Sequence, residues 1–262
     1  MEVDKADLII QAADDEERPV VKVASGVAFL IIADGVTLEG FRVTSMWGIG
    51  IALRKNANDN RVIGNWVTAR NNTGIAVNKS HDNLIMGNEV SESEVGVELR
   101  GAHDNEVIEN EVSDAWRFGI ALFVGSTDNH IMDNVVVSES GIGIALHEKA
   151  NDNRVTGNWV TASNNTGIDV IDGSHDNLIT LNRVTYSEVG IELCDAHDNL
   201  IRGNNVSDSH EAGILVDEST GNVIEENEVR DSGEFDLFDS SYPPLPLANT
   251  WVDNVYVTRN WP

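Results

Sequence analysis

Asparagine recurs along this sequence at intervals that fix its architecture. Eight asparagines, seven of them preceded by aspartate, are separated by steps of 22 to 24 residues. They are Asn60, Asn83, Asn105, Asn129, Asn153, Asn177, Asn199 and Asn222. A second asparagine follows each of them five residues later, and in seven units a Gly-aliphatic pair comes eight or nine residues after that. Eight units in one register indicate a repeat protein built from equivalent turns.

Each unit alternates apolar and polar residues over short stretches, which is typical of β-strands and not of helices. In the unit around Asn83, the residues Ile85, Val90, Val97 and Leu99 are expected to point inward. A strand-only repeat predicts three short strands per turn, wound into an all-β parallel solenoid of nine to ten coils of 22–24 residues. The asparagines are expected at the bends, where stacked amides hydrogen-bond along the axis.

A longer repeat is superimposed on the short one. Residues 48–140 align with residues 141–233 at an offset of 93 or 94, which indicates a duplicated block of four coils. The expected regions are leading strands or a cap over 1–33, coils over 34–232, and a C-terminal part over 233–262 that holds the last coil, a proline loop at Pro243, Pro244 and Pro246, and a cap.

Charge limits the possible partners. The chain has 17 Lys and Arg against 44 Asp and Glu, a net charge of −27. Nucleic acid and anionic membranes are therefore excluded as partners, because both attract clustered basic residues. An acidic, lysine-poor surface is typical of proteins that work in high salt, and also of ordinary acidic secreted proteins. The single cysteine, Cys194, excludes an internal disulfide, and no apolar run is long enough to span a membrane.

The repeat motifs resemble a known family. Asn-Leu-Ile-Met-Gly-Asn at 83–88 and the recurring Gly-Ile-x-Leu are similar to repeats of right-handed parallel β-helix proteins, including the CASH and NosD-like groups of the pectate-lyase-like superfamily. The segments near 236–254 resemble the last coil of such proteins. The resemblance implies a single-stranded right-handed β-helix. It implies polysaccharide lyases, hydrolases and epimerases as relatives, together with proteins of no known reaction.

The expected location is extracellular or at the cell surface. Residues 1–7 carry charges where a secretion signal would have its apolar core, so a targeting segment would have to lie outside this sequence. A copper role of the NosD type would need clustered Met, His or Cys, and this sequence scatters them.

Four His-Asp-Asn triplets occupy one position of the repeat. They begin at His81, His103, His175 and His197. A catalytic residue is needed once, whereas a turn residue is needed in every coil. A turn role is therefore the main interpretation, and a ladder of metal ligands along the rod is the alternative.

Several outward residues are candidates for binding a carbohydrate polymer. Arg54 and Arg100 follow equivalent strands two coils apart, and guanidinium groups pair with carboxylates such as those of uronic acids. Trp66 and Trp159 are equivalent in the duplication, and Trp116 falls in a polar loop. Flat indole rings match the apolar faces of sugars. Alternatively, the arginines could result from random sequence change at the surface, and the tryptophans could pack against loops.

A separate outward column is apolar. It consists of Ile63, Met86, Ile108 and Met132. Such a strip predicts self-association or cover by a terminal segment, and not catalysis.

Acidic residues gather in neighbouring coils of the second copy. They are Asp169, Asp172, Glu192 and Asp195, with His147 one coil earlier. Asp169 and Glu192 share a strand position, so their side chains are expected about 5 Å apart. The four acids could hold Ca²⁺, and Asp169, Glu192 and His147 could form an acid–base set. In so acidic a chain, neighbouring carboxylates are also expected without a function.

Two functions therefore stay open. One is a surface-associated or secreted solenoid that binds a carbohydrate polymer or serves as a scaffold. The other is a polysaccharide lyase, hydrolase or epimerase with a carboxylate-centred, Ca²⁺-assisted site. An enzyme would show a cleft across three or more coils with a carboxylate, a base and a cation close together, whereas a scaffold would show flat faces.

Overall fold

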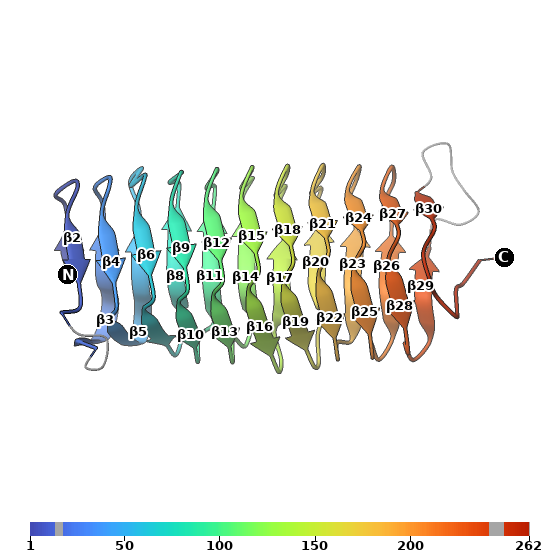
Figure 1. Ribbon diagram of the computed structural model, residues 1–262, viewed down its shortest axis with the longest axis horizontal. Helices are drawn as coiled ribbons and strands as arrows, with labels where there is room; N and C mark the ends of the chain where they lie inside the picture. Colours follow the sequence, from blue (N-terminus) through green and yellow to red (C-terminus); the bar gives the residue numbers. More distant parts are fainter. Residues whose placement is uncertain (14–17, 241–248, 262) are drawn as a thin grey trace.

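The protein is a straight rod of stacked coils, each built from three short strands (Figure 1). The structure is a computed structural model that describes residues 1–13, 18–240 and 249–261. Thirty strands are present in these ranges, all paired in parallel, and no helix there could cross a membrane. The predicted all-β parallel solenoid is thereby confirmed.

Three strand positions repeat along the rod. The first strands form an 11-stranded sheet of β2 (Ile9–Gln11), β4 (Thr37–Glu39), β6 (Arg61–Ile63), β9 (Leu84–Met86), β12 (Glu106–Ile108), β15 (His130–Met132), β18 (Arg154–Thr156), β21 (Leu178–Thr180), β24 (Leu200–Arg202), β27 (Val223–Glu225) and β30 (Thr250–Val252). The second strands are β7 (Trp66–Ala69), β10 (Glu89–Ser91), β13 (Glu111–Ser113), β16 (Val135–Ser138), β19 (Trp159–Ala162), β22 (Arg183–Thr185), β25 (Asn205–Ser207) and β28 (Glu228–Arg230). The third strands are β8 (Thr73–Asn78), β11 (Val95–Arg100), β14 (Phe118–Phe123), β17 (Ile142–Leu146), β20 (Ile168–Ile171), β23 (Val189–Cys194), β26 (Ala212–Asp217) and β29 (Phe235–Asp239). At the N-terminal end, β3 (Val20–Ile31) and β5 (Arg42–Leu53) each span the second and third positions, and β1 (Glu2–Val3) pairs with β3.

Apolar residues fill the interior of each coil, one from the first strand, one from the second and two from the third, such as Val97 and Leu99 of β11. In the first strands this column consists of Leu38, Val62, Ile85, Val107, Ile131, Val155, Ile179, Ile201 and Ile224, all buried. Burying each such side chain contributes about 1.5–3 kcal/mol. Stacking of like residues in successive coils therefore explains why the strand alternation is so regular.

Two asparagine ladders run along the bends, as the sequence predicts. The Nδ2 group of Asn105 donates to Oδ1 of Asn129, and the Nδ2 group of Asn129 donates to Oδ1 of Asn153, both at 3.0 Å. Each Oδ1 also accepts the backbone N–H of the asparagine one coil earlier. The amides thus satisfy buried backbone groups that the sharp turns would leave unpaired.

The glycine of the Gly-aliphatic pair is required by close packing. A Cβ atom added to Gly143 would lie 2.3 Å from Cγ1 of Val160 and 2.5 Å from the carbonyl oxygen of Gly167. We expect Gly143→Ala to destabilise the protein by about 1–3 kcal/mol, because neither neighbour can move without shifting a coil. Thermal unfolding measures the effect. Gly87→Asn is the control, since Gly87 has a left-handed φ of 61° that asparagine tolerates, and no atom lies within 4 Å of the added Cβ. Equal losses in both variants would contradict the packing argument.

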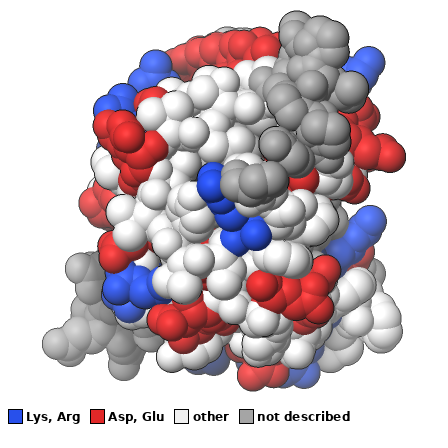
Figure 2. Space-filling view, turned by 90° about the vertical axis from the view of Figure 1, so that its right-hand side faces the viewer, with Lys and Arg blue, Asp and Glu red and all other residues white. Residues whose placement is uncertain are grey.

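The two ends of the rod differ. At the N-terminal end, β2 stacks in register on β4, and β3 stacks in register on β5. At the other end, Trp251 and Trp261 pack against the core with ring centroids 4.8 Å apart. Figure 2 looks on to this C-terminal end, where acidic residues surround a largely neutral middle. The predicted proline loop at Pro243, Pro244 and Pro246 lies outside the described residues.

Candidate functional site

The outer face of the third strands carries a hollow of about 410 Å³ that extends over five successive coils, from β8 to the turn after β20. Its lining includes Thr73, Glu98, Arg100, Phe118, Phe123 and His147. The outward residues of β11, β14 and β17 form a hydrophobic cluster of their own, separate from the core: Val95, Phe118, Ala121, Phe123 and Ala145. The result is a groove with an apolar floor and charged groups on both sides of it along the rod. We call it the third-strand groove.

His147 lies in this groove and is held by Asp169 of the next coil. Its Nε2 atom is 2.8 Å from Oδ2 of Asp169, and the two side chains are only 10% and 7% exposed. The rings of Phe118 and Phe123 meet the imidazole edge-on, with centroids 5.5 and 5.7 Å away. No hydrogen bond to its Nδ1 atom exists within the described residues. A carboxylate that accepts from Nε2–H leaves Nδ1 as a free proton acceptor.

Asp169 and Glu192 are directly paired in register on β20 and β23. The Oδ1 atom of Asp169 is buried and has no hydrogen-bond partner, whereas Oε2 of Glu192 accepts from Oγ1 of Thr166 at 2.9 Å. Burial raises the pKa of Glu192 above its ordinary value, and the negative charge of Asp169 raises it further. Burial beside a second carboxyl group therefore favours the protonated form of Glu192 more than in an exposed glutamate.

The raised pKa of Glu192 predicts a stabilising substitution. A carboxyl whose pKa is higher in the folded state stabilises the fold below its unfolded pKa, and this contribution is lost as the pH rises through the folded value. Glu192→Gln keeps an acceptor for Thr166 and removes the charge. At neutral pH we expect its melting temperature to exceed that of the parent by about 2–4 °C, with the difference shrinking toward pH 4. Melting curves across this range test it, and a difference that grows on acidification would contradict it.

The two arginines predicted to bind carboxylates, Arg54 and Arg100, differ in their ion pairs. Arg100 at the end of β11 is already paired, with its Nε atom 2.9 Å from Oε1 of Glu98 and its Nη1 atom 4.0 Å from Glu148. Its guanidinium also lies over the ring of Phe123. Arg54 follows β5 and makes no ion pair with any described residue. Of the two arginines, only Arg54 is free to bind an anion.

The predicted tryptophans do not share a surface with the arginines. Trp66 and Trp159 begin β7 and β19, on the outer face of the second strands, and are 43% and 50% exposed. Arg18 stacks on the first ring at 4.7 Å and Arg183 on the second at 5.0 Å. Trp116 lies between β13 and β14 and is 51% exposed. The structure thus separates the second-strand tryptophans from the third-strand groove.

The predicted acidic residues divide into two groups. Asp172, in the turn after β20, lines the third-strand groove, whereas Asp169 is linked to it through His147 and Glu192 is not part of its lining. Asp172 and Asp195 both have left-handed φ values, 56° and 49°. Asp195 sits 3.5 Å from His197. Across residues 1–13, 18–240 and 249–261, no three His, Cys, Asp or Glu side chains are grouped so that they could hold a metal ion.

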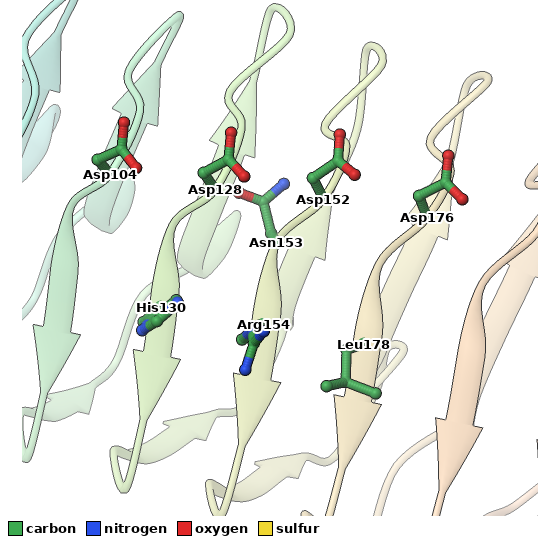
Figure 3. A pocket seen from close by; sticks show the side chains of 8 residues that line it. All are labelled: Asp104, Asp128, His130, Asp152, Asn153, Arg154, Asp176 and Leu178. Atoms are coloured by element: carbon green, nitrogen blue, oxygen red, sulfur yellow. The ribbon is translucent and has the colours of Figure 1, made fainter.

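A second hollow is lined by a regular row of aspartates. Figure 3 shows Asp104, Asp128, Asp152 and Asp176 at the same turn position of successive coils, above His130 and Arg154. All four aspartates have left-handed backbones. Asp and Asn tolerate that conformation, so the row is explained by the needs of the turn.

Two further predicted groups can be placed. His81 and His103 stack with centroids 4.7 Å apart, and the Nδ1 atom of each ring contacts the aspartate that follows it, at 2.6 and 2.8 Å. These contacts are local, as a turn role implies. The column of Ile63, Met86, Ile108 and Met132 is in register across β6, β9, β12 and β15, and its members are half-buried. Self-association through this strip stays a prediction.

Sequence reasoning missed the groove itself. Phe118, Phe123 and Glu98 were not predicted as site residues. The available signal was a change at two outward positions of the third strands, where Val95 and Arg100 of β11 give way to Phe118 and Phe123 of β14. Only the register shows that this coil lies between Arg100 and His147.

Comparisons with known proteins agree on the fold. The family model for a right-handed β-helix region matches residues 25–184, and that for the periplasmic copper-binding protein NosD matches residues 133–255. No curated protein matches the sequence. The donor set described above, with one cysteine and no group of three ligands in the described part of the chain, does not fit a copper ion.

Solved structures are similar at low identity. The periplasmic alginate epimerase AlgG superposes with a TM-score of 0.75 at 15% identity, over 89% of this chain and 62% of that one, so the present chain spans less than two thirds of the epimerase. DFA-IIIase from Arthrobacter chlorophenolicus A6 gives 0.70 at 15% identity, over 90% and 71%. The Dettilon tailspike protein gives 0.67 at 16%, over 93% and 60%. The motifs, the stacked parallel coils and the matching family model together establish that this chain belongs to the right-handed parallel β-helix family.

Proposed function

We propose that this chain is an extracellular or periplasmic protein that binds a carbohydrate polymer along the third-strand groove and carries out acid–base chemistry on it. The observation that carries the proposal is the His147–Asp169 pair, which is buried on an outer face and leaves one carboxylate oxygen without a partner. Burying a hydrogen-bonded imidazole and carboxyl group at an outward position gives little stability, so a purely structural solenoid has no need of the pair.

The groove suits a glycan for physical reasons. Phe118 and Phe123 form an apolar floor beneath Arg117 and Arg100, while Thr73, Glu98 and Arg100 supply hydrogen-bonding groups along the rod axis. Sugar rings combine an apolar face with hydroxyl groups at the rim, so they match such a surface. An epimerase named for alginate is among the similar structures, which supports a polysaccharide as the ligand.

The residues divide into roles that a reaction on a sugar would use. His147 would accept a proton at Nδ1 from water or from a sugar carbon, with Asp169 as the positioning residue. Glu192, whose raised pKa favours the protonated form, would donate a proton to a leaving oxygen. This set supports hydrolysis, elimination or epimerisation. A Ca²⁺-assisted version would have to recruit oxygen ligands from the substrate, since the described acids do not form a metal group.

A polysaccharide panel tests the proposal directly. Gel retardation measures binding, new reducing ends report hydrolysis, ultraviolet absorbance reports unsaturated products of elimination, and solvent deuterium in the sugar reports epimerisation. We expect binding of at least one polymer and one of the three chemical signals. Binding without any reaction would leave a binding solenoid and refute the chemistry. An absence of binding to every polymer would refute a carbohydrate role.

The binding-only alternative has one observation in its favour. Thr73 donates to Glu98 at 3.0 Å, and Thr166 donates to Glu192 at 2.9 Å, so the duplication repeats one Thr–Glu unit on the same face. Repeated contacts suit a polymer that is bound along its length.

A further inference from the structure

The turn that follows the third strands changes its charge along the rod. One residue of this turn has a left-handed φ, between 45° and 60°, at the same register position in each of eight successive coils. Because this position accepts lysine, glycine and valine in the first four coils, its backbone does not require the acids of the last four. Those acids are therefore available to function. In chain order the eight residues are Lys55, Lys79, Gly101, Val124, Glu148, Asp172, Asp195 and Glu218.

From β17 onward this side of the rod is acidic. The strands β17, β20, β23 and β26 lie side by side in Figure 1. Within these four strands and the turns directly after them, the chain has one lysine, Lys149, and no arginine. Lys149 is not part of the lining of the third-strand groove. The acids of the same segments are Glu148, Asp169, Asp172, Glu192, Asp195, Asp217 and Glu218.

Two titratable groups report a negative potential on this face. Burial raises the pKa of Glu192, and the charges of Asp169 and Asp217 are among those that raise it further. Burial also raises the pKa of the Cys194 thiol, and the carboxylates of Asp217 and Glu192 add to that shift. The same carboxylates would stabilise a positively charged group of a ligand and would repel an anionic sugar.

The open polar groups at the acidic end of the groove are hydrogen-bond acceptors. His147 lines the groove, is only 10% exposed and has no partner at Nδ1 among the described residues, while Oδ1 of Asp169 is buried without a partner. Asp172 also lines the groove and makes no ion pair with any residue that the structure describes. Glu148 reaches Arg100 at 4.0 Å. A ligand that supplies donors would satisfy these acceptors.

The arginine and threonine donors of the lining are already engaged. Thr73 and Arg100 donate to Glu98 at 3.0 and 2.9 Å, and Arg117 donates to Glu94 at 3.2 Å. A carboxylate ligand would add acceptors alone, and an acetamide group would add one donor and one acceptor. An ammonium group supplies three N–H donors together with a positive charge, so it matches the open acceptors best.

We propose that the glycan of the third-strand groove is an amino-sugar polymer, whose free ammonium groups bind the carboxylates of Glu148 and Asp172 beside His147. The inference rests on the proposed glycan-binding function and names the substrate class of that site. Sugar rings would lie along the apolar floor at Phe118 and Phe123, with the amino group directed to the acidic turns. An acetylated amine loses the charge, and an acidic sugar leaves the carboxylates without compensation.

Hexasaccharides that share one backbone test the substrate class on the full chain. The β-1,4-linked hexamers of glucosamine, N-acetylglucosamine and glucose differ only at C2, which carries an ammonium, an acetamide or a hydroxyl group. Below the pKa of the sugar amine, we expect the glucosamine hexamer to bind at least about tenfold more tightly than the other two in calorimetry. We also expect it to shift the ring resonances of His147 in NMR spectra. Equal or tighter binding of an uncharged hexamer would overturn the inference.

Matched double variants locate the bound amino group. We expect Glu148→Gln/Asp172→Asn to weaken binding of the glucosamine hexamer about tenfold or more, and to leave binding of the glucose hexamer nearly unchanged. Asp128→Asn/Asp152→Asn is the control, because it removes the same charge from the turns before the first strands, where asparagine tolerates the left-handed φ values of 55° and 57°. An equal loss in both double variants would reduce the effect to net charge and overturn the inference.

The outcomes separate the inference from the proposed function. If uncharged glycans bind and the amino group gives no advantage, the inference fails and glycan binding stands. If a lysine peptide of equal charge binds as tightly as the glucosamine hexamer and shifts His147 equally, the sugar is not recognised and the inference fails. If no glycan of any kind binds, the proposed function fails, and the inference fails with it.

Discussion

Replacing Asn129 with alanine is expected to lower the stability of the rod by about 3–5 kcal/mol. The side chain is fully buried and donates to the carbonyl oxygens of Ala102 and Thr127 and to Oδ1 of Asn153. Its own Oδ1 accepts both the backbone N–H and the Nδ2 group of Asn105. Alanine leaves these partners unpaired in a place that water reaches poorly, and each such group costs about 1–3 kcal/mol.

Thermal and denaturant unfolding measure the loss, and hydrogen exchange locates it. The Asn105 amide should exchange faster in the variant, since its acceptor is gone. Asn164→Ala provides the control, because Asn164 is exposed and makes a single 2.7 Å bond to the carbonyl oxygen of Glu139. The control should change stability by less than about 0.5 kcal/mol. If Asn129→Ala were equally mild, the ladder would not be a source of stability.

Replacing His147 with glutamine is expected to reduce turnover of a responsive polysaccharide by about 10²–10⁴-fold, the range contributed by a positioned general base. Glutamine can still donate to Asp169, so the buried carboxylate keeps a partner and the fold should persist. Binding should weaken far less than turnover, since the substitution leaves the other residues that line the third-strand groove unchanged. Initial rates, together with binding measured separately, test this expectation.

Two variants distinguish a proton-transfer role from a structural one. Asp169→Asn should also lower turnover and should change the dependence of the rate on pH, because Asp169 sets which nitrogen of His147 carries the proton. His130→Gln is the control, since His130 lies on β15, outside the third-strand groove, and should leave the rate unchanged. A rate that survives both His147→Gln and Asp169→Asn would remove the pair from the reaction.

Much of the fold follows from the sequence because each coil repeats the same physical problem. A bend needs a side chain that bridges to the next bend, and Asn105, Asn129 and Asn153 solve it in the same way in successive coils. The alternation of apolar and polar residues places Ile85 and its equivalents inward in every first strand. Such local requirements leave a periodic trace, and periodicity can be read without knowing any contact.

The candidate site follows only in part. The pairing of Asp169 with Glu192, and the place of His147 beside them, could be predicted from equal positions in neighbouring coils. Whether the candidates Trp66 and Arg54 share a surface could not be predicted, because Trp66 lies on a second strand and Arg54 follows a third-strand position, on different faces of the rod. Periodicity gives the position of a residue within a coil but not the angle between successive strands.

The sequence by itself determined the solenoid, the ladders and the duplication, since each depends on residues that recur every 22 to 24 positions. Only the tertiary structure decided that Phe118 and Phe123 close around His147, that Arg100 is neutralised while Arg54 is free, and that one oxygen of Asp169 is left without a partner. These features occur once and not in every coil. They depend on distances between side chains of adjacent coils, and those distances leave no repeating pattern in the sequence.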